Sequence, residues 1–407
     1  MNRRLEASKL DIARERHASH YNSLLGTANQ FYLKGHDGIN EGLAMLDLER
    51  SNIESGQAWA ASESERNVVA AELTINFAVL GAQVLWLRQH PRDCIRWQEM
   101  ALTAARRFQV RSREGILLNT LGVAYSDLGE VARAIECHEQ AVAIARELGD
   151  KRAQSNALGN LGVAFSDLGE MRRSITYYEQ QLDIVRELGN RRAEAIALGN
   201  LGLAYAALGE VERAIEYHEQ HRQIAIDLGD RRSEGAALTS LGNAYMAHGK
   251  TQQAINFYEQ RIAIAREMED RRGEGIVLGN LGLAYAQLGD WQRTISIYER
   301  QLEIVRKSGD RRSESNALGN LGISYRNMGQ VQHSLQFYEQ QLAIVRETGD
   351  LRAQGTVLFN MSLVLDQLGK RDEAIVRADD ALKILASLES PYTEMVRVQL
   401  ATWRSPK

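Results

Sequence analysis

The chain has 407 residues with a formal net charge of −4 at pH 7, and 44% of the residues are hydrophobic. This balance excludes a generally basic nucleic-acid-binding protein, because binding to phosphates normally needs an excess of Lys and Arg. Two cysteines without paired spacing argue against a disulfide framework or a structural zinc site, and three prolines with 6% aromatic residues favour helix over sheet. No apolar run approaches the roughly 20 residues that span a bilayer, and the N-terminus lacks a signal-peptide core. We therefore expect an all-α protein in the reducing cytoplasm.

The N-terminal region, residues 1–70, has no internal repeat and predicts two helices, at roughly 3–34 and 38–61. The segment KGHDG at 34–38 separates them, because its two glycines disfavour a continuous helix. We expect this region to cap the rest of the chain or to link it to another part.

A period of forty residues organises the rest of the chain. It is seen in LGVAYSDLGE at 121–130, LGVAFSDLGE at 161–170 and LGLAYAALGE at 201–210. Self-similarity at a fixed period indicates stacked supersecondary units, none of which buries its apolar face alone. Seven good units cover 111–390.

Each unit has the pattern of two antiparallel helices. In the unit at 151–190, the first helix is expected to reach about Leu168, and the second to run from about Met171 to Leu188. Apolar residues recur at three- and four-residue steps, so each helix has one buried stripe. Gly162 lies in the middle of the first helix, where close approach of the partner helix is the expected reason for a glycine.

Both ends of the repeat array depart from the pattern, as terminal repeats often do. Residues 71–110 keep the register as a divergent unit, with Ala82 in place of the glycine of the other units. At the other end, Ser390 and Pro391 are typical of a helix start, so residues 391–407 predict a closing helix and a tail.

The repeat resembles a known family. The Leu-Gly pair at 161–162, the aromatic residue at 165, the small residue at 174 and Tyr178 resemble the tetratricopeptide repeat. The forty-residue form, without a proline at the end of the second helix, is similar to the repeats of kinesin light chains, Pins-type adaptors and bacterial signalling NTPases. The resemblance implies a right-handed α-solenoid of antiparallel helix pairs.

A second resemblance concerns the N-terminal region. The segment LAMLDLERSNIESGQAWA at 43–60 is similar to the helix that joins the winged-helix region to the repeats in STAND, NB-ARC-like NTPases. This similarity implies either the sensor part of such a protein or a standalone relative. The sequence itself has no nucleotide-binding region of that class.

Local patterns that suggest chemistry are better explained by the repeat. GNAYMAHGKT at 242–251 ends like a phosphate-binding loop, but Ala244 stands where that motif needs glycine, and the repeat puts the segment at a helix end. His218 and His221 lack a third metal ligand, and His218 occupies a tyrosine packing position, so we expect packing. Neither a nucleophile elbow nor an HExxH motif occurs. We predict a protein that is not an enzyme and has no cofactor or metal.

Basic pairs begin most first helices, for example Arg191-Arg192 and Arg311-Arg312, where the helix dipole disfavours cations. Acidic residues such as Glu194 follow within a turn, so a nearly balanced ladder of charges along one edge is expected. Two interpretations remain open: a structural or solubilising edge, and an edge that receives an acidic partner.

An asparagine recurs within the apolar run ALGNLG and its near copy VLGNLG. Because the leucines of this run point into the helix pair, the register turns the asparagines toward the inner, concave side. Amides there offer donors and acceptors to a peptide backbone, and neighbouring aliphatic side chains offer an apolar floor. The candidate backbone clamps are Asn160, Asn200, Asn243, Asn280, Asn320 and Asn360, and the candidate floor residues are Leu203, Leu283 and Ile323.

The asparagines have an alternative role, which is a hydrogen bond to a helix of the adjacent repeat. The two roles can coexist. The resemblance to kinesin-light-chain-like repeats favours ligand contact, since the matching positions in that family face the peptide groove. Glycines beside the amides, at 159, 199, 279 and 319, are expected to leave room for a close approach of the ligand.

The predicted function is a protein–protein interaction scaffold that binds a peptide or protein segment in the concave groove. The main alternative is the ligand-sensing regulatory region of a STAND-type signalling ATPase, with a small molecule or a protein as inducer. An RNA-binding solenoid is a weaker third option, because the near-neutral groove does not favour the salt-dependent binding of a phosphate backbone.

Overall fold

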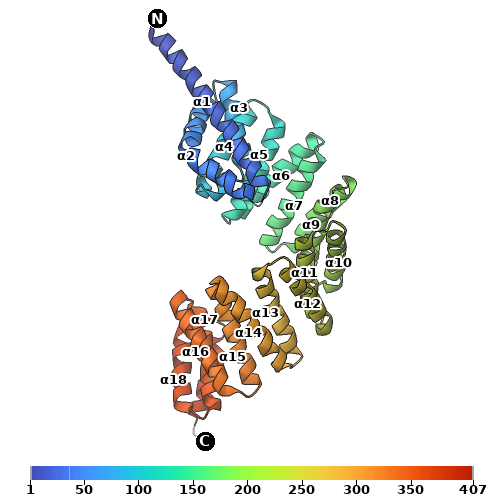
Figure 1. Ribbon diagram of the computed structural model, residues 1–407, viewed down its shortest axis with the longest axis vertical. Coiled ribbons are helices and arrows are strands. Elements are labelled where there is room, and N and C mark those ends of the chain that lie inside the picture. The colour runs from blue at the N-terminus through green and yellow to red at the C-terminus, as the bar shows by residue number, and fades with distance from the viewer. Residues whose placement is uncertain (1, 36, 406–407) are drawn as a thin grey trace. The chain divides into compact units, whose positions relative to one another are not determined.

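The chain is described by a computed structural model that covers residues 2–35 and 37–405. Within these residues the regular structure is entirely helical and no strand occurs, which confirms the all-α prediction (Figure 1). The chain divides into two compact units, Met1–Gly209 and Glu210–Lys407.

The first unit begins with two long helices, α1 (Asn2–Leu33) and α2 (Asp37–Glu63), which pack against each other and against α3. They lie where the sequence predicts two N-terminal helices. The remaining elements of this unit are α3 (Val68–Gly81), the 3-10 helix η1 (Leu85–Leu87), α4 (Pro91–Arg107), α5 (Arg111–Asp127), α6 (Val131–Glu147), α7 (Lys151–Asp167), α8 (Met171–Glu187) and α9 (Arg191–Ala207).

The second unit continues the same alternation of first and second helices and closes with a shorter helix. Its elements are α10 (Val211–Asp227), α11 (Arg231–Ala247), α12 (Thr251–Glu267), α13 (Arg271–Gln287), α14 (Trp291–Ser308), α15 (Arg311–Asn327), α16 (Val331–Thr348), α17 (Leu351–Gln367), α18 (Arg371–Ser387) and α19 (Thr393–Arg404).

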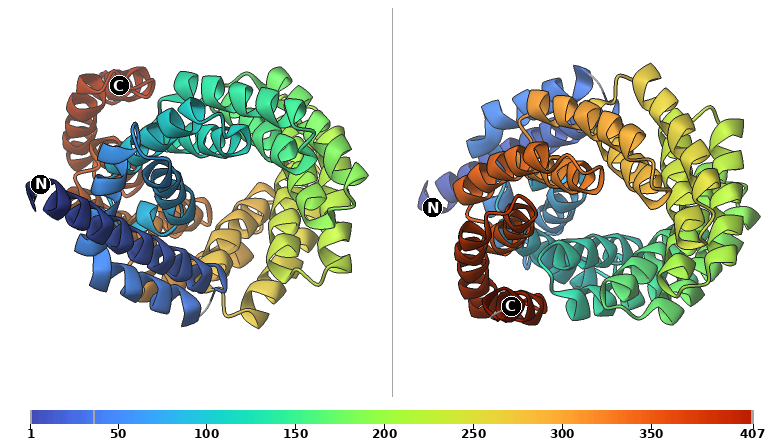
Figure 2. Two further views of the ribbon diagram at one scale, coloured as in Figure 1. Left: turned by 90° about the horizontal axis from the view of Figure 1, so that it is seen from above. Right: turned by 90° about the horizontal axis from the view of Figure 1, so that it is seen from below.

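The helix boundaries follow from local chemistry. The Asp150 side chain accepts a hydrogen bond from the backbone N–H of Ala153 at 2.9 Å and caps the start of α7. Gly169 and Gly189, with φ of 77° and 62°, take the left-handed conformation just after α7 and α8. Figure 2 shows the resulting stack of helix pairs in each unit.

Each pair is packed through its apolar stripes, and successive pairs pack on each other. In the pair α7 and α8, Leu161, Phe165, Tyr178 and Val185 are buried. First helices also contact the first helix of the next repeat, as α5 does with α7 and α11 with α13. The first helices of neighbouring repeats are therefore close enough for their side chains to bind one another.

The mid-helix glycine allows a tyrosine of the partner helix to pack against the backbone. A Cβ at Gly162 would lie closer than 3.0 Å to the ring of Tyr178, and the same holds for Gly282 with Tyr298. This confirms close approach as the reason for the glycine, and the approaching group is a ring rather than a backbone.

Gly282→Ala should destabilise the protein by roughly 1–3 kcal/mol, although alanine is the better helix former, because the added methyl overpacks the buried Tyr298 ring. Gly275→Ala is the matched control in the same helix. Its Cβ would meet Ile304 at an ordinary 3.4 Å, so that change should be neutral or stabilising. The urea midpoint of unfolding, followed by circular dichroism, measures both variants. Equal midpoints for the two variants would contradict the packing argument.

The two ends of the array differ from the repeat in detail. Helix α3 ends at Gly81, where a Cβ would clash with Leu85, and the chain then turns into η1 instead of completing the first helix. At the C-terminal end, α19 begins at Thr393, two residues later than Pro391, because Pro391 and Tyr392 form a turn.

Candidate functional site

The candidate residues lie on the exposed side of the first helices. The floor residues Leu203, Leu283 and Ile323 are 58%, 54% and 37% exposed, so each offers apolar surface to a ligand. Five of the six asparagines are half-buried, and Asn243 is exposed. We call this surface the amide face. Each of the two compact units has its own part of it.

Two of the candidate asparagines bind the adjacent repeat. Asn160 Nδ2 donates to Asn119 Oδ1 at 3.0 Å, from α7 to α5. Asn280 Nδ2 donates to Asn243 Oδ1 at 3.2 Å, from α13 to α11. For these two positions the structure therefore shows the bridge between repeats that was the alternative role.

The acceptors of these bonds occur where the repeat lacks its own asparagine. Thr120 and Ser240 occupy the asparagine position of their units, and Asn119 and Asn243 lie one residue before and three residues after it. Asn119 Oδ1 also lies 3.0 Å from His138 Nδ1, and Asn243 Oδ1 accepts from the Tyr258 hydroxyl at 2.8 Å. Asn119 could not be predicted from the repeat, because it stands at a glycine position of the pattern. Its departure from that pattern was the available signal.

Other candidate amides keep their hydrogen-bonding groups free. The side chains of Asn200, Asn320 and Asn360 have no hydrogen-bond partner among the residues that the structure describes. Asn320 and Asn360 lie together with Asn316 at a hollow of about 480 Å³ on α15 and α17. The same hollow is lined by the candidate floor residues Leu283 and Ile323 and also by Gly319, Gln341, Asp350, Arg352, Ala353, Thr356 and Val357.

At Gly159, Gly279 and Gly319, the space next to the glycine is taken by a glutamine side chain of the second helix. A Cβ at Gly159 would lie 2.5 Å from Gln181 Nε2, and one at Gly319 would lie 2.7 Å from Gln341 Nε2. These glycines admit a glutamine from the second helix of the same pair. The physical reason is that an amide extending across the pair fills the space that a methyl group would otherwise take. Their role is therefore internal packing.

The two histidines are packed, as expected. His218 is almost fully buried, and burial lowers its pKa to about 4, so it is neutral at pH 7. His221 Nε2 lies 2.8 Å from the Ser233 hydroxyl. Within residues 2–35 and 37–405, no group of three or more potential metal ligands is found. The Gly-Lys-Thr segment at 249–251 lies in the turn before α12 and at its first residue, as the repeat predicts.

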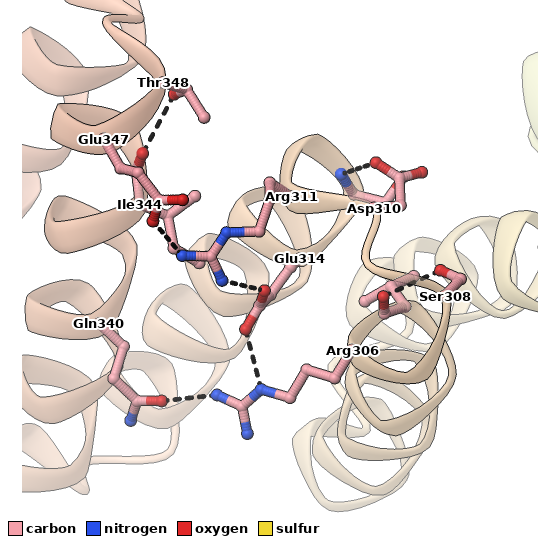
Figure 3. Close-up of polar contacts among 11 residues, drawn as sticks. Arg306, Ser308, Asp310, Arg311, Glu314, Gln340, Ile344, Glu347 and Thr348 are labelled. Carbon is pink, nitrogen blue, oxygen red and sulfur yellow. Dashed lines mark hydrogen bonds and ion pairs between the residues drawn. The ribbon is translucent and has the colours of Figure 1, made fainter.

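The charged edge is built around buried glutamates (Figure 3). Glu314 on α15 is buried, and its two oxygens accept from Arg306 Nε at 2.9 Å and from Arg311 Nη1 at 2.7 Å. Arg306 also donates to Gln340 at 2.8 Å, and Arg311 also pairs with Glu347. Three consecutive helices, α14, α15 and α16, are joined in this way. We call this arrangement a glutamate clamp.

Glutamate clamps recur along the chain. Glu114, Glu194 and Glu274 are buried in the same way, and each accepts from an arginine eight residues earlier and from another three residues earlier. The first arginine of each basic pair is thus engaged with carboxylates of the protein itself. This geometry favours the structural interpretation of the charged edge.

The carboxylates of Glu194 and Glu274 are held ionised. Burial alone raises the pKa of Glu194 and Glu274, but hydrogen bonds from Arg186 and Arg191 to the first, and from Arg266 to the second, outweigh burial and lower both pKa values below 4.5. A carboxyl group whose pKa is lower in the folded state stabilises the fold above its unfolded pKa. That contribution is lost as the pH falls through the folded pKa.

We therefore expect the urea midpoint to fall as the pH drops below about 6.5, because buried histidines such as His218 stay neutral in the folded state while they take up protons in the unfolded state, and to fall further below about pH 4.5 as Glu194 and Glu274 take up protons. The variant Glu194→Gln/Glu274→Gln should start from a lower midpoint and show a weaker dependence on pH. Circular dichroism at a series of pH values provides the measurement. The same slope in both proteins would assign the acid sensitivity to other carboxylates.

The stacked pairs and the face of their first helices define the chain as an α-solenoid. A family model described as tetratricopeptide repeat matches residues 113–187, 153–227, 193–267, 274–347 and 313–387, which together make up more than half of the sequence. The chain belongs to the tetratricopeptide repeat family. Proteins of this family are generally non-enzymatic scaffolds, and the repeats support a scaffold for protein interaction or sensing.

Several solved structures are similar to this chain. A putative kinesin light chain protein with TPR-like repeats from Podospora anserina is 25% identical to this chain. The match covers 47% of this chain and 95% of that protein, with a TM-score of 0.43. A STAND protein with a tetratricopeptide repeat sensor from Pyrococcus horikoshii is 13% identical to this chain. The match covers 93% of this chain and 64% of that protein, with a TM-score of 0.57.

A third similar structure is the apo form of the quorum sensor NprR from B. thuringiensis, with 12% identity, coverage of 84% of this chain and 95% of that chain, and a TM-score of 0.56. At this level of identity the last two similarities show the fold alone. No curated protein matches the chain. None of the described helices is long and apolar enough to cross a membrane.

Proposed function

We propose that the chain is a non-enzymatic scaffold that binds a peptide or protein segment on its amide face, and that the hollow on α15 and α17 is the main contact. The observation that carries this proposal is the meeting of four candidate residues at one hollow: Leu283, Asn320, Ile323 and Asn360. They come from three different repeats, in which they occupy two recurring positions of the first helix.

The chemistry of the hollow suits an extended peptide. The amides of Asn320 and Asn360 offer donors and acceptors that no described residue uses, so a peptide backbone can take them without breaking an internal bond. Leu283 and Ile323 are exposed aliphatic groups, which gain from covering an apolar ligand side chain. Arg352 and Asp350 lie at the same hollow and add one charge of each sign.

The other candidate residues take part to different degrees in this proposal. In the first unit, Asn200 and Leu203 offer the same pair of an unpartnered amide and an exposed aliphatic group on α9. Asn160, Asn243 and Asn280 take part mainly by bridging neighbouring repeats. We also propose that residues 1–70 and 391–407 cap the array and that 71–110 is a divergent repeat.

The direct test selects ligands without assuming their identity. Random peptides displayed on phage are selected on the full-length chain, and hydrogen–deuterium exchange is then compared with and without a selected peptide. We expect slower exchange in α15 and α17, where the bound backbone excludes water. Protection confined to second helices, or a failure to select any peptide, would contradict the proposal.

A sensor region of a STAND-type signalling ATPase is the second candidate function. The observation that favours it is the similarity to the P. horikoshii sensor protein, which extends over 93% of this chain and so beyond the matched repeats. In that case a peptide or small-molecule ligand of this chain would change the rate of ATP hydrolysis by an associated NTPase domain. An ATPase assay with such a domain, covalently joined or encoded beside this chain, distinguishes the two functions.

A further inference from the structure

A second hollow, of about 210 Å³, lies in the first unit between α5, α6 and α7, which contact one another. Its base is apolar, because Ala141, Ile144 and Ala145 of α6 line it and are buried. Gly115 of α5 completes the base, and a Cβ there would lie only 3.2 Å from Ile144 Cγ2. None of the candidate clamp or floor residues lines this hollow.

The size of the hollow follows from two small residues on the second helix. The repeat at 271–310 has a hollow at the same repeat positions, but its volume is about 110 Å³. There, Gln301 and Val305 line the hollow at the positions of Ala141 and Ala145. Because glutamine and valine are larger than alanine, they take up space that stays open in the first unit.

The hollow opens onto the amide face of the first unit. Thr120, which occupies the asparagine position of its repeat, lies at the rim, and so does the exposed side chain of Ile116 one turn earlier on α5. Asn156 on α7 forms the opposite part of the rim. A ligand that lies along the amide face therefore passes over the hollow.

The volume fits one side chain and not a whole small molecule. Small-molecule sites usually have about 300–1,000 Å³, whereas an apolar cavity of about 150 Å³ takes a benzene ring. A hollow of about 210 Å³ therefore has room for the ring of a phenylalanine or the branched chain of a leucine or isoleucine. The rest of such a ligand lies outside the hollow.

The rim offers hydrogen bonds but no positive charge. Asn156 is exposed, and its side chain has no hydrogen-bond partner among the described residues. Asp150 is the one charged residue in the described lining, whereas Arg271 and Arg272 line the hollow at 271–310. An acidic side chain would be repelled by Asp150, and any charged group would lose its hydration at the apolar base. The hollow therefore selects an uncharged, apolar group.

We propose that this hollow binds one large apolar side chain, of Leu, Ile or Phe, from a peptide or protein segment that lies on the amide face of the first unit. The inference rests on the proposed function and adds to it a second contact with a defined side-chain preference. This anchor side chain covers Ala141, Ile144 and Ala145, and its burial supplies most of the affinity of the contact. The backbone beside the anchor forms hydrogen bonds with Asn156.

A subtractive selection tests the proposal. Random peptides displayed on phage are selected on the full-length chain and then depleted on the variant Ala153→Phe. Ala153 on α7 lines the hollow and is partly exposed, so a phenylalanine there occupies the hollow without replacing a buried side chain. We expect the remaining peptides to share one Leu, Ile or Phe. Changing that residue of the peptide to alanine should weaken binding by roughly 10- to 100-fold, measured by fluorescence anisotropy.

Two variants locate the contact in the hollow. Ala145→Val fills part of the base with the residue that the repeat at 271–310 has at this position, and it should weaken binding by roughly tenfold while the helical content stays the same. Asn156→Ala should weaken binding by roughly 2- to 10-fold. The matched control is Ala265→Val, because Ala265 is buried at the same repeat position of α12 but does not line this hollow. The control should leave the affinity unchanged.

Hydrogen–deuterium exchange separates failure of this inference from failure of the proposed function. Slower exchange in α5 and α7 with a remaining peptide supports the inference. If no peptide remains after depletion while other selected peptides protect α15 and α17, the inference is overturned and the proposed function stands. Remaining peptides without a shared large apolar residue, or equal affinity for the original chain and Ala145→Val, also overturn it. Failure to select any peptide on the original chain overturns both.

Discussion

Replacing Asn320 and Asn360 together with alanine should weaken binding of a selected peptide by roughly 5- to 100-fold, since each lost hydrogen bond to the peptide backbone contributes about 0.5–1.5 kcal/mol. The urea midpoint should stay nearly the same, because neither amide has a partner among the described residues. Isothermal titration calorimetry with a peptide selected on the original chain provides the affinity. The effect should not depend on the peptide's side chains, because the amides are proposed to bind its backbone.

The matched control is Asn160→Ala, which removes an amide that bridges two repeats. This change should lower the free energy of unfolding by about 0.5–1.5 kcal/mol, because Asn119 loses its donor, and should leave peptide affinity at the second unit's hollow unchanged. A double variant of Asn320 and Asn360 that loses stability but keeps its affinity would reverse the roles assigned to the two groups of asparagines.

Glu274→Gln should have the largest effect on stability, lowering the free energy of unfolding by roughly 2–4 kcal/mol. Glu274 is completely buried and accepts from Arg266 at 2.9 Å, Arg271 at 3.3 Å and Arg300 at 2.5 Å. A neutral amide cannot accept from all three guanidinium groups, and one of its atoms becomes a donor facing cations. The arginines are partly exposed, so water screens their interaction with Glu274. We therefore expect a smaller loss of stability than for a fully buried group of three charges.

Glu234→Gln gives the internal comparison for this effect. Glu234 is also buried and occupies the same repeat position, but Ile226 stands where the other clamps have their earlier arginine. Arg231 at 2.7 Å supplies the hydrogen bond in this clamp. The Gln variant should therefore lose about half as much stability as Glu274→Gln. Equal losses would show that burial of the glutamate, and not the number of arginines, determines its contribution.

The sequence predicted the fold in detail because the repeat is a local pattern. Apolar residues at helical spacing, a capping aspartate such as Asp150 and a left-handed glycine such as Gly169 fix each helix within a single unit. Stacking of such units then buries a continuous core, because each unit contacts only its neighbours. The same locality explains why the exposed positions of Leu203, Leu283 and Ile323 followed correctly from register alone.

The roles of the asparagines depended on contacts that no single unit contains. The repeat pattern gives Asn160, Asn280, Asn320 and Asn360 the same environment, but the first two bind acceptors in the preceding repeat and the last two do not. The difference arises from Asn119 and Asn243, which lie about forty residues away and outside the repeated position. Periodicity therefore could not separate bridging amides from unpartnered ones.

By itself the sequence determined the helix pairs, their register and the family, because spacing, caps and turn glycines act over a few residues. Only the tertiary structure decided which amides remain without a partner, that Gln181 and Gln341 fill the space beside the glycines, and that glutamates such as Glu314 are clamped from three helices. These features depend on the distance between side chains of neighbouring helices. That distance is set by how neighbouring helices pack, and the repeat period of the sequence gives no information about it.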